Sequence, residues 1–453
     1  MSISPFRPLH EVKTLSAIGG PIVATQLMRM GLNVVDTMMA GNLSALDLAA
    51  VAIGNALYIP VGVFCFGILL AVNPVVAHHL GARSFEEIGK SARQLFWMIG
   101  FLTLPAILLI RNLDLVMIWV GVTPDIIPLA DDYLDALSWG VLPLLLYAGV
   151  RFFSEGLSVT RPAMYIAAAS LGVNVFANWV LMYGKLGFPA LGAVGAGYAT
   201  SIVNTFGAIA FLLFTYRFVP FKRFQIFKRT KGPEWATIRE ILRVGLPNGM
   251  SSSLEVLLFA SISVLMGTLS VKTAAAHQIS INIAATMFMI PFGLSMAISQ
   301  RVGYSLGQGS MEKARHRGFV GIALCTAIMC CTAALLFTLP EYIIGLYTDD
   351  PEVVTIALSL VFLAGVFQIS DGLQVGAYGA LRGLKDTRVP LLVNFIAYWL
   401  VGFSAGYMLG IKLELGPQGL WIGLISGLSV AAVLHNLRFH LLTKPAKTVV
   451  ETE

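Results

Sequence analysis

The sequence predicts an all-α integral membrane protein with twelve transmembrane helices in two pseudo-symmetric six-helix bundles. Three observations support this prediction: long apolar runs recur along the whole chain, lysine and arginine are unevenly distributed among its loops, and its two halves resemble each other at a fixed offset. These observations bear in turn on the number of spans, their orientation and their symmetry.

Apolar residues dominate the composition. Of the 453 residues, 57% are hydrophobic and 12% are charged, whereas ordinary soluble proteins are about 25% charged. Mean hydropathy is +0.80, and the uncharged runs match the roughly 20 residues that a helix needs to cross a bilayer. The predicted spans lie near residues 14–39, 48–74, 94–113, 126–150, 163–184, 192–217, 240–268, 274–302, 318–340, 352–378, 389–411 and 418–441.

Basic residues indicate the orientation of the spans. With both termini placed in the cytoplasm, 25 of the 30 Lys and Arg residues fall in inner segments, as the positive-inside rule requires. Four fall in outer loops, and Arg29 lies inside the first span. The net charge of +6 is therefore an orientation signal and does not indicate a nucleic-acid partner.

The two halves of the chain align at an offset of 226 residues, which pairs Pro21 with Pro247 and Gly41 with Gly267. An even number of spans in each repeat gives both halves the same orientation, as in transporters with parallel repeats. We therefore predict an amino-terminal six-helix lobe at residues 1–217, a basic cytoplasmic linker at 218–239 and a carboxyl-terminal six-helix lobe at 240–453.

Three carboxylates lie within the predicted spans: Asp36, Glu255 and Asp371. A charge at mid-membrane costs about 2.5–3.5 kcal/mol on insertion scales, so each needs a partner, a proton or a wet cavity. A functional role is the first interpretation. A structural ion pair, or a position nearer the interface, is the alternative.

The first span carries a polar face around one of these acids. Its members recur at helical spacing, namely Gln26, Arg29, Asn33 and Asp36. At the offset of the repeat, Arg29 aligns with Glu255. We therefore predict that these two residues form a gating or structural pair.

Polar residues of other spans suggest a cation site. Asn174 and Asn178 lie four residues apart in the fifth span, and Thr200 lies in the sixth. Amide and hydroxyl oxygens beside a carboxylate suit a hard monovalent cation, but such residues also form ordinary interhelical hydrogen bonds. In the tenth span, Gln374 lies one turn beyond Asp371.

Motifs of several other protein classes are missing from the sequence. The glycine-rich stretch at Gly192–Gly197 has no preceding strand, so it is not a phosphate-binding loop, and its glycines are spaced for close helix packing. The sequence also contains no GxxxxGK[ST] motif. The four cysteines show neither disulfide nor zinc spacing. His277 is either a proton relay or a packed histidine.

Several motifs, in this order and spacing, resemble those of the multidrug and toxic compound extrusion (MATE) family, and in particular its NorM branch. The resemblance covers nearly the whole chain. It rests on "VDTMMAG" (35–41), "GLSVTRPAMY" (156–165), "NVFANWVLMYG" (174–184), "AAHQIS" (275–280), "RVGYSLGQG" (301–309), "FQISD" (367–371), "LRGLKDTR" (381–388) and "AYW" (397–399).

The resemblance implies a MATE-like fold with a V-shaped cleft between the lobes. It also implies a multidrug efflux antiporter, not an enzyme, that exports hydrophobic, often cationic drugs and dyes by alternating access. The coupling cation is Na⁺, which is favoured, or H⁺, and no cofactor is expected. The protein is expected to be a monomer in the bacterial inner membrane, with both termini cytoplasmic.

The resemblance also assigns roles to individual residues. Those expected to couple ions or protons are Asp36, Asn174, Asn178, Thr200, Glu255 and Asp371, the first four forming a possible Na⁺ site. Candidates for substrate binding or gating are Arg29, Asn33, Gln278, Gln374 and Tyr398. The sequence departs from the family at Phe367, where related sequences often carry Tyr, and at Arg29, where an uncharged polar residue such as Gln is typical.

Three other functions fit the sequence less well than antiport. A flippase of lipid-linked substrates would need more cationic residues around its cavity than the single intramembrane Arg29. A membrane-embedded enzyme would need a catalytic constellation beside the acids. A receptor or scaffold would leave three buried carboxylates unexplained.

Overall fold

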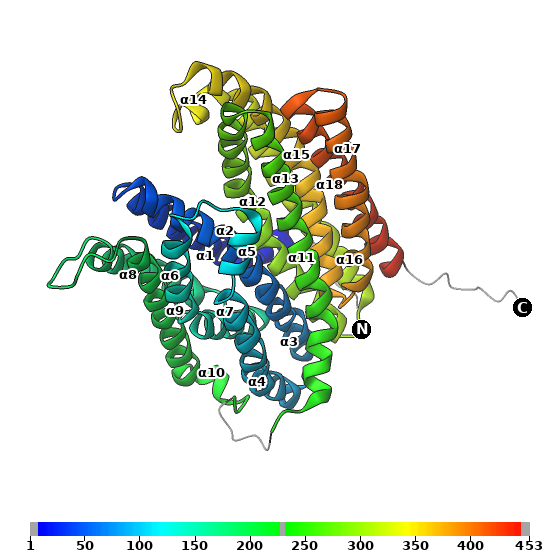
Figure 1. The fold of residues 1–453 in the computed structure, drawn as a ribbon. Helices are drawn as coiled ribbons and strands as arrows, with labels where there is room; N and C mark the ends of the chain where they lie inside the picture. The colour runs from blue at the N-terminus through cyan, green and yellow to red at the C-terminus, as the bar shows by residue number, and fades with distance from the viewer. Residues whose placement is uncertain (1–7, 227–231, 445–453) are drawn as a thin grey trace, which may run out of the picture. The chain divides into compact units, whose positions relative to one another are not determined.

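The computed structural model describes residues 8–226 and 232–444, and every regular element in them is a helix (Figure 1). The all-α prediction is confirmed. The two chain ends and residues 227–231 of the predicted linker lie outside the described residues. The first helices are α1 (Pro8–Gly41), α2 (Ala45–Leu70), α3 (Val72–Gly81), α4 (Phe85–Ile110), α5 (Asp114–Val120), α6 (Ile127–Ser138), α7 (Val141–Gly156), α8 (Arg161–Leu181), α9 (Gly192–Arg217) and α10 (Val219–Lys222).

The second half of the chain continues in the same way, with two short π-helical segments near its end. π-Helices are rare and occur frequently at functional sites. The elements are α11 (Trp235–Leu269), α12 (Val271–Gly307), α13 (Met311–Thr338), α14 (Pro340–Gly345), α15 (Pro351–Gly383), α16 (Arg388–Phe395), η1 (Ile396–Phe403), α17 (Ser404–Tyr407), η2 (Met408–Lys412) and α18 (Gly416–Thr443).

Ten helical segments of the described residues are long and apolar enough to cross a membrane, with α2 and α3 counted as one. The pair α6 and α7, bent by 47°, provides an eleventh. Helix α1 is 34 residues long, but its polar face lowers its hydropathy and it is not among them. With α1 included, the arrangement agrees with the predicted twelve spans.

The chain forms two compact units. The amino-terminal unit contains residues 21–76, 84–226 and 232–256, and the carboxyl-terminal unit contains residues 8–20, 77–83 and 257–444. Helices α1 and α11 therefore each contribute to both units. The lobe boundaries at 217 and 240 follow the sequence repeat, and they remain a prediction.

Equivalent helices of the two repeats begin with equivalent caps. The Ser44 hydroxyl accepts a hydrogen bond from the Asp47 amide at 3.0 Å at the start of α2. The Ser270 hydroxyl, 226 residues later, accepts one from the Thr273 amide at 3.0 Å at the start of α12. Such caps pair a backbone amide that the helix itself leaves without a hydrogen bond. The two halves of the chain therefore share the same N-cap residue at equivalent helices.

In the amino-terminal unit, helix α9 packs against α6, α7 and α8 (Figure 1). A Cβ atom at Gly195 would lie 2.6 Å from the Leu181 carbonyl oxygen of α8. One at Gly197 would lie 2.8 Å from the Tyr133 carbonyl oxygen of α6. Small residues let helices approach closely in membranes, so the predicted packing role of these glycines is confirmed.

In the carboxyl-terminal unit, helix α15 packs against α12, α13 and α18. A Cβ atom at Gly379 would lie 2.6 Å from the Ser295 carbonyl oxygen of α12. The core of this unit includes the buried side chains of Phe367, Tyr398 and Trp421. Tyr398 belongs to η1, so a π-helical segment presents its hydroxyl to the interior.

Candidate functional site

Asp36 is the centre of a cluster of polar side chains in the amino-terminal unit. Its Oδ1 accepts hydrogen bonds from the Nδ2 atoms of Asn174 at 2.9 Å and Asn178 at 2.6 Å. Its Oδ2 accepts one from the Thr200 hydroxyl at 3.3 Å. The carboxylate is 5% exposed. It therefore has three neutral donors, and no ion pair within the described residues includes it.

Three helices hold this cluster together. Asn174 and Asn178 lie one turn apart on α8, so both amides reach the same oxygen of Asp36 on α1. Thr200 lies on α9, which packs directly against α8. The structure thus brings together the four side chains predicted to form a cation site.

One oxygen of the cluster has no partner. Asn178 Oδ1 is buried and makes no hydrogen bond with the described residues. Leaving a buried acceptor unpaired costs about 1–3 kcal/mol, and an amide oxygen is a suitable ligand for a hard cation. Rotation of the amide about its last torsion exchanges its NH₂ group for this oxygen. The carboxylate, amide and hydroxyl oxygens of the cluster therefore fit a small cation bound beside Asp36.

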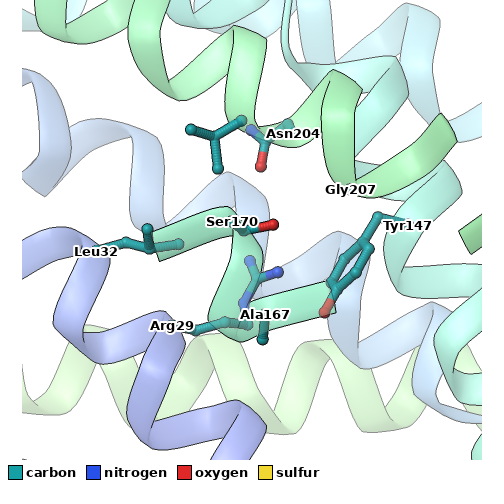
Figure 2. A pocket seen from close by; sticks show the side chains of 8 residues that line it. Arg29, Leu32, Tyr147, Ala167, Ser170, Asn204 and Gly207 are labelled. Carbon is teal, nitrogen blue, oxygen red and sulfur yellow. The ribbon is translucent and has the colours of Figure 1, made fainter. Parts of the chain in front are cut away.

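Arg29 lies two turns before Asp36 on α1 and lines a small cavity (Figure 2). Its guanidinium carbon lies 5.3 Å from the centre of the Phe66 ring and 5.5 Å from that of Tyr147. Among the described residues it forms no ion pair with Glu255 or with any other acid. The structure therefore does not contain the predicted pair, because aromatic rings surround the guanidinium instead.

Asp371 is buried in α15 of the carboxyl-terminal unit. One turn further on, Gln374 donates a hydrogen bond from Nε2 to the Tyr398 hydroxyl at 2.9 Å. The Phe367 ring, one turn before the acid, packs edge-on against Trp421 with the ring centres 6.1 Å apart. Two of the predicted binding residues are thus bonded to each other, and the departure at Phe367 belongs to the apolar core.

Three further candidates lie outside both clusters. Glu255 is half-buried in α11 and makes neither a hydrogen bond nor an ion pair with the described residues. Asn33 and Gln278 are exposed, and neither side chain forms a hydrogen bond within the same residues. Their roles remain predictions.

His277 is packed in the carboxyl-terminal unit. Its Nδ1 accepts a hydrogen bond from the Trp421 indole at 3.2 Å. Its Nε2 therefore carries the proton and donates it to the Ser263 hydroxyl at 3.0 Å. Both ring nitrogens of the neutral imidazole are satisfied, which favours the packed histidine over the proton relay.

A buried ion pair that was not predicted from the sequence lies near the end of α7. Arg151 Nε lies 2.7 Å from Glu155 Oε1, and the two side chains are 4% and 0% exposed. Arg151 Nη2 also donates to Gln26 Oε1 at 2.7 Å. The predicted span ends near residue 150, whereas α7 continues to Gly156. Opposite charges four residues apart were the signal that could have revealed this pair.

A second missed acid lies near the start of α1. The Glu11 carboxylate accepts hydrogen bonds from Nε and Nη2 of Arg301, each at 2.6 Å. Arg317 Nε lies 3.5 Å from the same carboxylate. This bidentate pair fastens the first turns of α1 to α12 and α13 within the carboxyl-terminal unit.

Comparison with known proteins identifies the family to which the sequence is similar. The sequence profile of the MatE family matches residues 21–180 and, a second time, residues 247–408. The two matches begin at 21 and 247, which is the offset of 226 residues seen in the sequence repeat. The profile therefore recognises both halves of the chain.

Relatives and solved structures agree with this match. The chain is 39% identical over 442 residues to the multidrug resistance protein MdtK of Yersinia enterocolitica, with 96% of each protein covered. It is 36% identical over 432 residues to the multidrug resistance protein NorM of Aliivibrio fischeri, with 94% of each covered.

The eukaryotic MATE transporter AtDTX14 has the same fold, with a TM-score of 0.88, 23% identity and 97% of each chain covered. A MOP superfamily transporter from Pyrococcus furiosus matches with a TM-score of 0.85, 19% identity and 96% of each chain covered. The chain therefore belongs to the MatE family of multidrug and toxic compound extrusion proteins, and it is a membrane transporter rather than an enzyme.

Proposed function

We propose that this transporter is a multidrug efflux antiporter, which exports hydrophobic, often cationic compounds in exchange for Na⁺ or H⁺ by alternating access. The observation that carries the proposal is the buried Asp36 carboxylate, which three neutral donors surround and which no basic side chain of the described residues neutralises. The curated relatives named for multidrug resistance support the substrate class.

The Asp36 cluster is the proposed site of the coupling cation. Without a cation, the amides of Asn174 and Asn178 and the hydroxyl of Thr200 stabilise the carboxylate by donating hydrogen bonds. When Na⁺ binds, the two amides turn their oxygens toward it, and the hydroxyl does the same with its lone pairs. The buried, unpartnered Asn178 Oδ1 supports this exchange.

Na⁺ is favoured over H⁺ as the coupling ion because the cluster offers a set of hard oxygen ligands. These are the carboxylate, two amide oxygens and one hydroxyl oxygen, the ligand types that hard cations prefer. A proton would need only the carboxylate and none of the amide or hydroxyl oxygens as ligands.

The ion drives export by competing with the drug for negative charge. A cation bound at Asp36 weakens the hold of the protein on a cationic drug, and the drug leaves. The exchange performs work only if ion and drug prefer different states, because a ligand with equal affinity for both states shifts nothing. Each net charge that the exchange moves through 100 mV supplies about 2.3 kcal/mol, which corresponds to a roughly fortyfold drug gradient.

The other predicted sites complete the proposal. Glu255 and Asp371 are proposed to carry further charge for ion or substrate binding. Gln374 and Tyr398, which bond to each other at 2.9 Å, together with Asn33 and Gln278, are proposed to contact substrate or to gate its path. The protein is proposed to act as a monomer in the bacterial inner membrane, with both termini cytoplasmic and two lobes that rock around a cleft.

Ethidium efflux from proteoliposomes tests this function. The purified full chain is reconstituted, and either a Na⁺ gradient at equal pH or a pH gradient without Na⁺ is imposed. We expect efflux under the Na⁺ gradient in the wild type and none in Asp36→Asn. Asp47→Asn is the control, because the Asp47 carboxylate lies outside the Asp36 cluster and accepts hydrogen bonds from the Ser44 hydroxyl at 2.6 Å and the Ala193 amide at 2.7 Å. The absence of efflux under both gradients in the wild type would rule out the antiporter.

A further inference from the structure

The short segment that follows α9 is fixed to the amino-terminal unit by its aromatic rings. Phe221 in α10 and Phe224 just beyond it are 2% and 3% exposed. The Phe221 ring packs edge-on against Phe153 of α7, with the ring centres 5.9 Å apart, and against Phe218, with the centres 5.0 Å apart. The segment is therefore a packed part of the surface of this unit.

Helix α4 holds the same segment from another side. The Phe85 and Phe224 ring centres lie 6.2 Å apart, and a Cβ atom at Gly89 would lie 2.2 Å from the Phe224 carbonyl oxygen. Arg93 Nη1 donates a hydrogen bond to the Gln225 carbonyl oxygen at 3.2 Å. Figure 1 shows that α10 lies at the same end of the unit as the start of α4. The backbone of the segment therefore rests directly on α4.

This packing holds an exposed guanidinium between two rings. The guanidinium carbon of Arg223 lies 4.8 Å from the centre of the Phe85 ring and 4.7 Å from that of Phe224. Aromatic rings attract a cation and orient the plane of the guanidinium. Within the described residues this guanidinium makes neither a hydrogen bond nor an ion pair. Arg223 is thus held in place while its five N–H donors have no protein acceptor there.

Positive charge is in excess around Arg223. Arg217 and Lys222 are exposed, and neither side chain bonds to an acid in the part of the chain that the structure describes. The acids in the first turn of α4, Glu86 and Glu87, already have a basic partner, since their Oε1 atoms lie 3.4 Å and 2.8 Å from Lys90 Nζ. The segment therefore offers a surface suited to an anion.

The position of the segment indicates where that anion comes from. Helix α9 is one of the helices long and apolar enough to cross a membrane, and it ends at Arg217, six residues before Arg223. Leu213 and Val219, on either side of that end, are 52% and 70% exposed. Exposed apolar residues beside basic ones are typical of segments at the boundary between acyl chains and headgroups. The guanidinium therefore lies near the headgroup layer of the bilayer.

We propose that Arg223 is the phosphate-binding residue of an anionic-lipid site, which binds the phosphodiester of phosphatidylglycerol while the acyl chains of the lipid contact Leu213 and Val219. A guanidinium binds phosphate oxygens through two parallel hydrogen bonds. Basic residues just outside a span attract anionic lipids. The charges of Arg217 and Lys222 disfavour the choline group of phosphatidylcholine, so the site selects a lipid with net negative charge. The site is separate from the Asp36 cluster and does not depend on the coupling ion.

Native mass spectrometry of the purified full chain in detergent tests the site. It measures the affinity for the first lipid molecule that binds, with phosphatidylglycerol and phosphatidylcholine of the same acyl chains as probes. We expect the wild type to bind phosphatidylglycerol about tenfold more tightly than phosphatidylcholine, and Arg223→Gln to lose this preference. Phe85→Leu keeps the charge and should weaken binding of phosphatidylglycerol about threefold, because the guanidinium is then less ordered before the lipid binds.

Arg111→Gln is the matched control. Arg111 follows the other end of α4 and also lies on a ring, with its guanidinium carbon 5.4 Å from the centre of the Trp139 ring, but it has Asp135 at 3.6 Å. We expect this variant to bind both lipids as the wild type does. Equal losses in Arg111→Gln and Arg223→Gln, or equal affinity of the wild type for both lipids, would overturn the site.

Two further results separate this site from simpler explanations. Wild-type affinity for phosphatidylglycerol in Phe85→Leu would mean that charge alone attracts the lipid, and the assignment to a guanidinium held between rings would be wrong. Inorganic phosphate, added as a competitor, should not displace phosphatidylglycerol, because it lacks the acyl chains. Displacement would identify a site for free phosphate and overturn the lipid site.

Discussion

The side-chain amide of Asn178 donates a hydrogen bond to Asp36 Oδ1 at 2.6 Å, the shortest of the three bonds that this carboxylate accepts. The two residues are 142 positions apart in the chain. The bond joins α1 to α8 inside one compact unit, so a change in the charge of Asp36 acts directly on the contact between these two helices.

The geometry of the Asp36 cluster predicts an order of effects for its neutral members. Asn178→Ala should raise the Na⁺ concentration for half-maximal efflux most, by about tenfold or more, because its bond to the charged carboxylate is the shortest. Thr200→Val should have the smallest effect, because its bond is 3.3 Å long. The measurement is the rate of ethidium efflux as a function of Na⁺ concentration. An effect of Thr200→Val larger than that of Asn178→Ala would contradict the proposed ligand set.

The buried pair Arg151–Glu155 predicts strong coupling between two substitutions. Glu155→Met alone leaves the Arg151 charge buried and should destabilise the protein by about 3–5 kcal/mol. The double variant Arg151→Met/Glu155→Met removes both charges and should be closer to the wild type than either single variant. Thermal unfolding of the purified protein in detergent measures the difference. Additive losses in the double variant would show that the pair is not coupled.

His277 is predicted to support the structure without carrying protons. His277→Ala removes hydrogen bonds to Trp421 and Ser263 and should lower the midpoint of thermal unfolding. Ser263→Ala removes only one of these partners and should lower it less. The pH dependence of efflux should stay the same in both variants, because the imidazole is neutral and both its nitrogens are occupied. A pH profile of efflux that shifts in His277→Ala but not in Ser263→Ala would favour the interpretation of His277 as a proton relay.

The Glu11–Arg301 pair predicts that the start of α1 is held by charge. Glu11→Gln keeps the size of the side chain but leaves Arg301 without its bidentate partner, and it should cost on the order of 3 kcal/mol. Glu312→Gln is the control, because Glu312 is an exposed acid in the first turn of α13. Limited proteolysis and thermal unfolding measure both variants. Equal stability of the two would mean that the buried pair contributes no more than a surface charge.

Much of the fold could be predicted from the sequence because the bilayer imposes a simple length rule. The positions of the spans follow the apolar runs, and the double match of the family profile agrees with the repeat. The residues of the Asp36 cluster could be named because Asn174 and Asn178 share one helical face, because Thr200 is a polar residue of the next span, and because the family resemblance assigns them to one site with Asp36. Helix periodicity, the repeat and the resemblance together were enough for these features.

The features that the sequence analysis missed depend on where helices end and how side chains pack. Helix α7 continues beyond its apolar run, so the hydropathy pattern placed Arg151 and Glu155 outside the span although both are buried. The repeat aligns Arg29 with Glu255, but alignment of backbone positions does not determine side-chain contacts. The guanidinium of Arg29 packs on aromatic rings instead.

The central claim is that Asp36 binds the cation that is exchanged for drug, and ethidium-dependent Na⁺ flux tests it most directly. Proteoliposomes containing the full chain are loaded with ethidium, and uptake of radioactive Na⁺ is measured at equal pH on both sides. We expect ethidium to accelerate Na⁺ uptake in the wild type and in Asp47→Asn, and to have no effect in Asp36→Asn. Ethidium-dependent Na⁺ uptake by Asp36→Asn at the wild-type rate would contradict the account.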